Sequence, residues 1–373
     1  MDNNWISIRN DFPCLLDTTY LNAAGVTPLP SVVHQAGVNI LNRMHFDAKK
    51  FAEDMLFVNI AAHQSVADFY NVDINDIAFV HTTSLGMNML ALHLGRRRKN
   101  GKHIVTLADE FPASTLPWSA HGFELTYVDA DESNRISVES ILAALTPQTE
   151  AVVASYVQSG TGCRLDIHTL ANELRTRNIP LILNATQAAG CIQIDLAKTP
   201  VAAMLVSGNK WMMAGYGATT LYVSKELRDD SFPPLAGWLT AEPFSFTNNR
   251  LNALSRNAPG LELGLNSLVP IACLEAAVKY IQGIGVENIE KRIAELASFL
   301  IKELKQRGAK IITPLDSAEH AGIITIVRSD AYQWIEKLKA RNIVVVSRGE
   351  NTVRISPHFY NNLTDIEQLL ENW

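Results

Sequence analysis

One lysine, Lys210, stands in a stretch that otherwise excludes charge. It follows an apolar run and a small polar step in "LVSGNK" (205–210), and small residues and glycine follow it in "WMMAGYGATT". A lysine that is desolvated near other positive charge loses its proton easily, and its free amine can then form a Schiff base with an aldehyde. The alternative is an exposed loop lysine, the usual setting for this residue type.

A cluster of hydroxyl groups could hold a phosphate. The segment "HTTSLGMN" follows the apolar run "DIAFV" and places Thr82, Thr83 and Ser84 at the start of a predicted helix. Free backbone donors and the dipole at a helix N-terminus favour an anion. The alternative is that these hydroxyls only cap the helix.

Aromatic and polar side chains follow other apolar runs. Phe111 comes after "HIVTLA", Asn184 and Gln187 come after "PLILN", and Ser207 and Asn209 precede the lysine. A lone phenylalanine is usually a core residue, and polar pairs at strand ends are often only turn residues. Ligands of parallel α/β sheets, however, bind beyond the carboxyl ends of the strands, where all these residues are predicted to lie. An aldehyde cofactor with a phosphate arm, pyridoxal phosphate, fits this combination of groups.

Short β-rich runs alternate with helical patterns between residues 76 and 224, which indicates a parallel sheet covered by helices. The runs are apolar throughout, as expected of strands with both faces buried. We therefore predict an α/β fold. The predicted strands are 76–80, 103–108, 124–129, 151–157, 180–186, 202–208 and 219–224.

The pattern changes to longer helices after about residue 262. Within 286–308, apolar residues recur every three or four positions, which predicts an amphipathic helix that ends at Gly308. Further strand and helix patterns predict a smaller α+β unit. The predicted organisation is an N-terminal segment (1–20) that packs on the small domain, a large domain (21–255) and a small C-terminal domain (256–373).

Composition narrows the class of protein. The chain has 373 residues, of which 47% are hydrophobic, and a net charge of −6, so neither a disordered chain nor a nucleic-acid-binding protein is expected. The beginning "MDNNWISIRNDFP" lacks the pattern of a signal peptide, and no run is long and apolar enough to span a bilayer. Four dispersed cysteines suit a reducing compartment and no structural metal site. We expect a cytoplasmic protein that acts on a small molecule.

The blocks of sequence, in their order, resemble class V aminotransferases, which are fold type I pyridoxal phosphate enzymes. The tryptophan after the lysine and the ending "SPHFYNNLTDIEQLL" resemble the branch of isopenicillin N epimerase and the lyases more than that of the cysteine desulfurases. The resemblance implies a large domain with a mainly parallel seven-stranded sheet between helices, a smaller C-terminal α+β domain and a homodimer. The blocks are "FVHTTSLGMN", "DEFPAS", "VQSGTG", "LILNATQAAG", "VSGNKW" and "TVRISPHFYN".

The resemblance also implies roles for individual residues. Lys210 would carry the cofactor as a Schiff base and later move the proton, and Phe111 would stack on the pyridine ring. Gln187 and Ser159 would lie near the ring hydroxyl. The phosphate would be held by Thr83, Ser84 and Ser207.

Two residues are assigned to the substrate. Arg354, in "TVRISP", falls on the arginine that binds the substrate carboxylate, a task that suits a bidentate guanidinium. Asn22 is placed with it on the substrate side. The alternative for Arg354 is a solvated strand arginine.

The chain departs from the family pattern at several positions. Asn184 replaces the aspartate that pairs with the pyridine nitrogen, and Asn209 replaces a histidine before the lysine; both stay in the predicted cofactor site. Leu261, in "NAPGLELG", replaces a threonine that contacts the neighbouring subunit's cofactor. The segment "VVVSRGENTVR" (344–354) lacks the persulfide cysteine of the desulfurases.

Two hypotheses about function follow. The first is a homodimeric pyridoxal phosphate enzyme that acts on a small amino acid by transamination, β-elimination or epimerisation, with cysteine desulfurization disfavoured. The second is a degenerate relative that keeps the fold as a binding or scaffold protein. The departures favour the second hypothesis, and the retained lysine and arginine favour the first.

Overall fold

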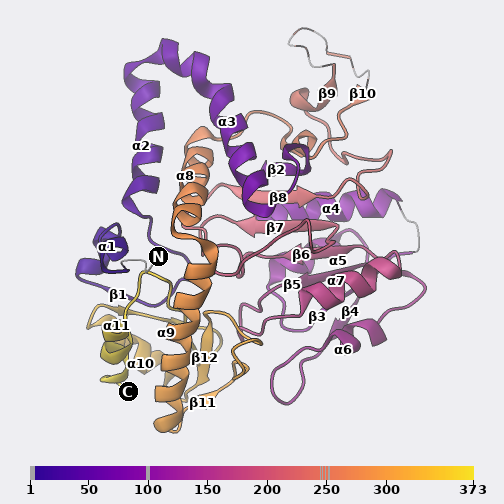
Figure 1. Cartoon of the computed structure of the whole chain (residues 1–373). Coiled ribbons are helices and arrows are strands. Elements are labelled where there is room, and N and C mark those ends of the chain that lie inside the picture. Colours follow the sequence, from indigo (N-terminus) through magenta and orange to yellow (C-terminus); the bar gives the residue numbers. More distant parts are fainter. Residues whose placement is uncertain (1–4, 98–100, 244, 246, 248, 251–252) are drawn as a thin grey trace.

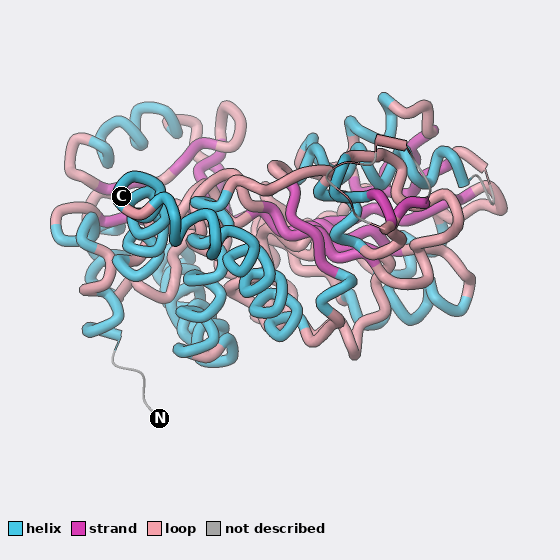
Figure 2. Tube along the Cα trace, turned by 90° about the horizontal axis from the view of Figure 1, so that it is seen from above, coloured by secondary structure: helices cyan, strands magenta, loops and turns pink. Residues whose placement is uncertain are grey.

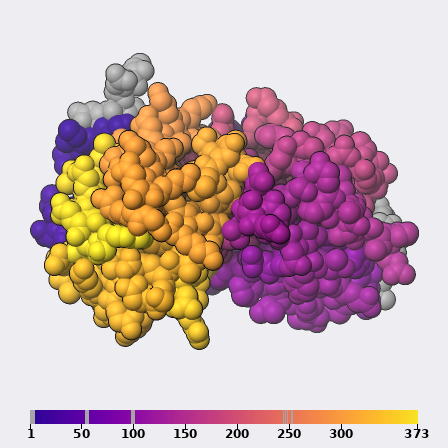
Figure 3. Space-filling model, turned by 90° about the horizontal axis from the view of Figure 1, so that it is seen from below, coloured from indigo at the N-terminus to yellow at the C-terminus, as the bar shows by residue number. Residues whose placement is uncertain are grey.

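The computed structural model shows two parts side by side, a large sheet between helices and a smaller C-terminal unit (Figure 1, Figure 3). It describes residues 5–97, 101–243, 245, 247, 249–250 and 253–373, so residues 1–4 of the predicted N-terminal segment lie outside it.

The large sheet has seven strands in the order β2-β8-β7-β6-β5-β3-β4. β8 runs antiparallel to both neighbours, and the other pairs are parallel. The predicted mainly parallel seven-stranded sheet is therefore confirmed. The strands are β2 (Ile77–Val80), β3 (His103–Leu107), β4 (Glu124–Val128), β5 (Thr149–Ser155), β6 (Leu181–Asn184), β7 (Ala203–Ser207) and β8 (Thr219–Val223).

Helices cover both faces of this sheet, which explains why most of its strands are apolar throughout (Figure 2). Two separate clusters of buried side chains lie against it, one on each face. The helices that connect its strands have 5 to 15 residues. They are α4 (Thr83–Arg97), α5 (Leu116–Ala120), α6 (Val138–Ala143) and α7 (Ile167–Thr176).

Three long helices were not predicted individually. They are α2 (Ser31–Phe46), α3 (Ala48–Tyr70) and α8 (Leu268–Ile284). α8 packs against α2 and α3, and its buried face belongs to the core of the large sheet. In the described part of the chain, no single helix is long and apolar enough to cross a membrane; α8 and the following helix pass that test only as a pair bent by 78°.

The C-terminal unit is built on a four-stranded antiparallel sheet, in the order β11-β12-β15-β14, with helices packed on it. The predicted stripe of α9 is buried, and Gly308 follows the helix with a left-handed φ of 72°. The domain boundaries stay a prediction. The elements are α9 (Val286–Gln306), β11 (Lys310–Ile311), β12 (Ile324–Val327), α10 (Ala331–Lys339), β13 (Ile343–Val344), β14 (Val346–Ser347), β15 (Thr352–Ile355) and α11 (Leu363–Leu370).

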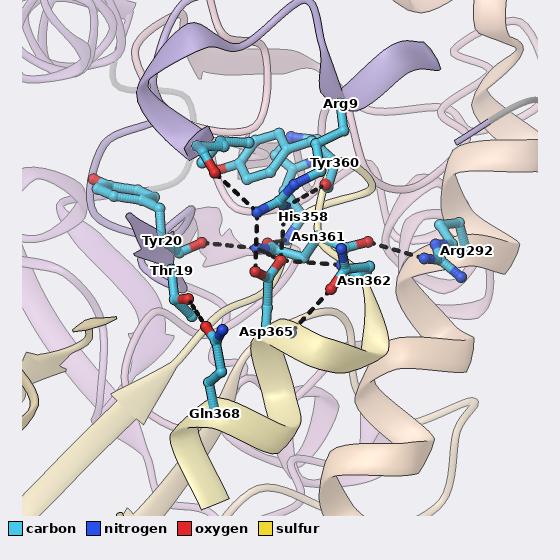
Figure 4. A network of polar contacts seen from close by, with 11 residues as sticks. Arg9, Thr19, Tyr20, Arg292, His358, Tyr360, Asn361, Asn362, Asp365 and Gln368 are labelled. Atoms are coloured by element: carbon cyan, nitrogen blue, oxygen red, sulfur yellow. Dashed lines mark hydrogen bonds and ion pairs between the residues drawn. The ribbon is translucent and has the colours of Figure 1, made fainter. Parts of the chain in front are cut away.

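The beginning of the chain is fixed to this unit. After α1 (Trp5–Arg9), strand β1 (Thr19–Tyr20) pairs in parallel with β13. A network of polar contacts secures the pairing (Figure 4). In it, Arg9 forms an ion pair with Asp365 at 2.7 Å, and Asn361 donates to that carboxylate and to the backbone oxygen of Tyr20. These contacts hold the segment that leads directly into Asn22.

Candidate functional site

The carboxyl ends of the central strands bring the predicted residues to one edge of the sheet. Ser207, the last residue of β7, pairs with Thr219, and Thr219 pairs with Val80 at the end of β2. On the other side of β7, Asn184 is the last residue of β6 and pairs with Ser155 of β5. The start of α4 and the turn that carries the lysine therefore lie at the same edge.

The turn after β7 is held by the N-terminal segment. The backbone nitrogen of Thr27 donates to the oxygen of Asn209 at 3.0 Å, and its hydroxyl donates to the oxygen of Lys210 at 2.5 Å. Gly190, with a φ of 90°, lets the loop after β6 approach this turn, because an added Cβ would lie 2.4 Å from the oxygen of Trp211. Backbone contacts thus fix where Lys210 leaves the sheet.

The amine of Lys210 lies in a cationic and poorly solvated environment. Burial, followed by the positive charges of Arg354 and Arg348, lowers its pKa from 10.5 to about 7. Its Nζ lies 5.4 Å from the ring centroid of Phe111. Within the described ranges this amine makes no hydrogen bond or ion pair. At neutral pH a large share of Lys210 is therefore a free amine, as nucleophilic attack on an aldehyde requires.

Two arginines bind one residue, Ser159. Arg354, on β15, is 2% exposed and donates to the oxygen of Ser159 at 2.9 Å and to Oδ1 of Asn22 at 3.5 Å. Arg348, on the loop between β14 and β15, donates to the hydroxyl of Ser159 at 3.1 Å. Burial and then the charge of Arg348 lower the pKa of Arg354 to about 9. The structure thus brings Arg354, Asn22 and Ser159 together beside Lys210.

Asn184 belongs to a buried polar network. Its Nδ2 donates to the hydroxyl of Ser114 at 2.9 Å, and its Oδ1 accepts from the backbone nitrogen of Thr186 at 3.2 Å. Ser114 in turn bonds to the carboxylate of Glu110. Because the backbone N–H of Thr186 can only donate, Oδ1 of Asn184 must face it, which leaves Nδ2 to donate to Ser114.

Glu110 is a buried acid that the sequence analysis did not identify. It accepts from the backbone nitrogen and the hydroxyl of Ser155, both at 2.5 Å, and from Gln158 at 3.1 Å. Burial raises the pKa of Glu110, although these hydrogen bonds act in the opposite direction. A buried acid therefore lies two hydrogen bonds from Asn184, where the family pattern has an aspartate.

Gln187 is held at both ends of its amide. Its Nε2 donates to the oxygen of Ala24 at 3.0 Å, and its Oε1 accepts from the indole of Trp211 at 2.8 Å. One hydrogen on Nε2 and one lone pair on Oε1 remain for a ligand. Its predicted role beside the ring hydroxyl stays a prediction, as do the roles of the other site residues.

The part of the site that is predicted to bind the cofactor's phosphate offers hydroxyl and amide donors. Thr82 caps α4 by accepting from the nitrogen of Leu85 at 3.1 Å, which leaves the hydroxyls of half-buried Thr83 and exposed Ser84 without a partner among the described residues. Ser207 donates its hydroxyl to Oδ1 of Asn209 at 2.6 Å. The amide Nδ2 of Asn209 is therefore the better-placed donor of that pair.

The residues present fit pyridoxal phosphate. They combine a neutral lysine amine, an adjacent aromatic face and free donors at a helix N-terminus. The guanidinium of Arg354 also has a buried Nε with no hydrogen-bond partner in the described part of the chain. Such an orphaned donor suits a site completed by an anion.

Two other observations bear on the departures from the family pattern. Leu261 is 1% exposed and packs in the core, so its side chain is not available to a neighbouring subunit. The loop between β14 and β15 carries Arg348 and no cysteine, so it lacks the persulfide cysteine of the desulfurase pattern. Among the described residues, no cluster of side chains could hold a metal ion.

Arg348 is the functional residue that the sequence analysis missed. Its segment, "SRGEN", has the composition of an exposed turn, and nothing in the spacing distinguishes a site arginine from a solvated one. The loop between the paired strands β14 and β15 places it beside Ser159, which is far away in sequence.

Comparisons with known proteins agree with the geometry. The family described as "Aminotransferase class-V" matches residues 19–369. A probable cysteine desulfurase from Pyrococcus abyssi is 25% identical, covering 97% of this chain and 95% of the relative. An isopenicillin N epimerase from Amycolatopsis lactamdurans is 26% identical, covering 98% of this chain and 97% of the relative. The apo structure of a cysteine desulfurase from Thermococcus onnurineus NA1 has a TM-score of 0.89 at 23% identity and covers 98% of this chain and 96% of that chain. This similarity confirms the fold.

Proposed function

The chain belongs to the class V aminotransferase family of pyridoxal phosphate enzymes, and from this premise we propose that it binds that cofactor through Lys210 and acts on an α-amino acid. The match over residues 19–369 confirms the predicted family, and the prediction of an enzyme is confirmed with it. The two named relatives have similar identities and different activities, so identity does not choose between their reactions.

The observation that carries the proposal is the state of Lys210. Its amine has a pKa of about 7, faces the ring of Phe111 and has no competing partner among the described residues. A surface lysine would remain protonated and would be free to move. The exposed-loop alternative is therefore disfavoured.

Pyridoxal phosphate, when bound, supplies an electron sink for negative charge that develops on the carbon beside the substrate's amino group. Arg354 binds the substrate carboxylate and orients that carbon. Phe111 would offer an aromatic face to the cofactor ring, and Asn184 and Gln187 would offer hydrogen bonds to its polar atoms. The Nζ of Lys210 is the group able to take a proton from the α-carbon and return it.

We favour chemistry at the α-carbon, or through it at the β-carbon, over a sulfur relay. Transamination, β-elimination and epimerisation all begin with proton removal that Lys210 can perform. The loop between β14 and β15 carries Arg348 and no cysteine. Of the four cysteines, Cys163, Cys191 and Cys273 are buried and Cys14 is exposed.

The test is cofactor trapping followed by product analysis. The protein should turn yellow with pyridoxal phosphate, and borohydride should fix the cofactor on Lys210, as read by peptide mass. An adduct at another lysine would end the assignment. The loaded protein is then incubated with an amino-acid panel, and ketoacid, ammonia and chirality are measured separately. No product from any member would favour the scaffold hypothesis.

We also propose a cytoplasmic homodimer. Large apolar side chains are exposed on the α2–α3 hairpin, and contiguous exposed apolar surface is typical of interfaces. Light scattering at micromolar concentration tests the dimer, and a fully active monomer would contradict it. The exposed side chains are Val32, Leu41, Met44, Phe46, Phe57 and Ile60.

A further inference from the structure

Three basic side chains face the same site without an acidic partner among the described residues. Lys210, Arg348 and Arg354 act on one another, and among the described residues no carboxylate forms an ion pair with any of them. Glu110, the residue before Phe111, is a buried acid, but its oxygens accept hydrogen bonds from Ser155 and Gln158 instead. Burying like charges together is unfavourable unless an anion joins them.

The proposed chemistry accounts for two of the three. Lys210 attaches the cofactor, and Arg354 binds the α-carboxylate of the substrate. Arg348 remains. It is half-buried, which lowers its pKa, and among the described residues its side chain makes one hydrogen bond, to the hydroxyl of Ser159. A guanidinium has five donors, so most of them are unused.

Arg348 points to the substrate side of the site. Its Cζ lies 5.8 Å from the ring centroid of Phe111, and its hydrogen-bond partner Ser159 also binds Arg354. The predicted phosphate donors, in contrast, lie at the start of α4, and within the described ranges none of them bonds to Arg348. The cofactor's phosphate is therefore a poor candidate for its partner.

We propose that Arg348 binds an acidic group on the substrate's side chain, so that the substrate is an α-amino acid with a second carboxylate. This inference rests on the proposed function. Since both arginines contact Ser159, their nearest nitrogens lie within about 10 Å of each other, given covalent geometry and hydrogen-bond lengths. Two carboxylates separated by a short side chain fit between them.

The experiment compares acids with their neutral amides. Protein loaded with pyridoxal phosphate is titrated with aspartate, asparagine, glutamate and glutamine, and dissociation constants are read from the cofactor's absorbance. One acid should bind roughly ten- to hundredfold more tightly than its amide, the effect expected of one hydrogen-bonded charge pair. A second readout uses cofactor-free protein, in which succinate should raise the melting temperature more than butyrate does.

Three variants assign the preference to Arg348. Arg348→Gln should remove it by weakening the acid while the amide binds as before, and Arg348→Lys should keep part of it. Arg135→Gln, which removes an exposed positive charge elsewhere, is the matched control. Equal binding of acids and amides by the wild type would overturn the inference. So would a preference that survives in Arg348→Gln, or a variant that weakens acid and amide equally.

The two proposals fail in different ways. If the cofactor does not attach to Lys210, the proposed function is wrong. If it attaches and acids bind no better than amides, only the assignment of Arg348 is wrong.

Discussion

The acidity of Lys210 can be measured without knowing the substrate. Burial and two arginines lower its pKa from 10.5 to about 7. That difference corresponds to about 5 kcal/mol between the protonated and neutral forms. At pH 7 about half of Lys210 is neutral, against about one in three thousand for a lysine in water. The rate of cofactor attachment should therefore rise with pH and level off above a midpoint of about 7.

The assay mixes cofactor-free protein with pyridoxal phosphate between pH 5.5 and 9.5, traps the adduct with borohydride and measures it by mass. Removing a nearby positive charge makes the ammonium form less unfavourable and so raises the pKa. The midpoint should move to higher pH in Arg348→Gln, and further in Arg354→Gln, whose charge is the larger of the two influences. Arg135→Gln should leave it unchanged.

Two results would refute this reasoning. A wild-type midpoint near 10 would mean that the site does not desolvate the amine. Midpoints that stay at 7 in both arginine variants would mean that burial alone sets the pKa. Because Arg354 is buried and its variant could be destabilised, the half-buried Arg348 gives the decisive comparison.

Three further predictions concern other parts of the site and its support. Arg354→Ala should weaken amino-acid binding by about 2 to 5 kcal/mol and leave cofactor occupancy intact, as absorbance titration would show; equal wild-type affinity for amino acids and their decarboxylated amines would contradict it. Asn184→Asp should destabilise cofactor-free protein by about 1 to 3 kcal/mol, since it removes a donor and adds charge near Glu110. The added carboxylate is ionised only at higher pH, so urea unfolding should show a larger loss at pH 8 than at pH 5, and an equal loss would count against the network. Arg9→Ala should lower the free energy of unfolding by about 2 kcal/mol, because the carboxylate of Asp365 is buried, and urea unfolding with no change would show that the hydrogen bonds from Asn361 suffice.

The sheet was predictable because its strands are buried on both faces. Each of the seven predicted runs overlaps an observed strand, and their ends, which carry Asn184 and Ser207, lie at one edge as expected. The stripe of α9 was equally clear, because one face of that helix meets the core. The long N-terminal helices were harder to identify, since α2 and α3 keep many apolar side chains exposed and lack a clean stripe.

The residues of the site were predictable only where they lie in sequence motifs. Lys210, Phe111 and Arg354 lie in blocks that resemble a family, and the structure brings them together. Glu110 and Arg348 have no such signal. Glu110 is buried because its loop turns toward Ser155, and Arg348 reaches Ser159, a residue far from it in sequence, from the loop between β14 and β15. Both depend on tertiary contacts, which spacing along the chain does not encode.

The two arginines link recognition of the substrate to proton transfer. Their charges lower the pKa of Lys210 in the absence of substrate, which keeps its amine free for the cofactor. On the proposed assignment, a substrate with two carboxylates neutralises both guanidinium groups when it binds. The same electrostatic coupling then acts in reverse, because coupling between two sites is reciprocal, and the pKa of the released lysine rises. The amine becomes a stronger base at the moment when it must take a proton from the α-carbon, whereas a monocarboxylate would leave the charge of Arg348 uncompensated and the lysine a weaker base. Discrimination between acidic and neutral amino acids should therefore be larger in the rate of α-proton exchange with deuterated water than in binding, and equal discrimination in the two measurements would show that Arg348 contributes to affinity alone.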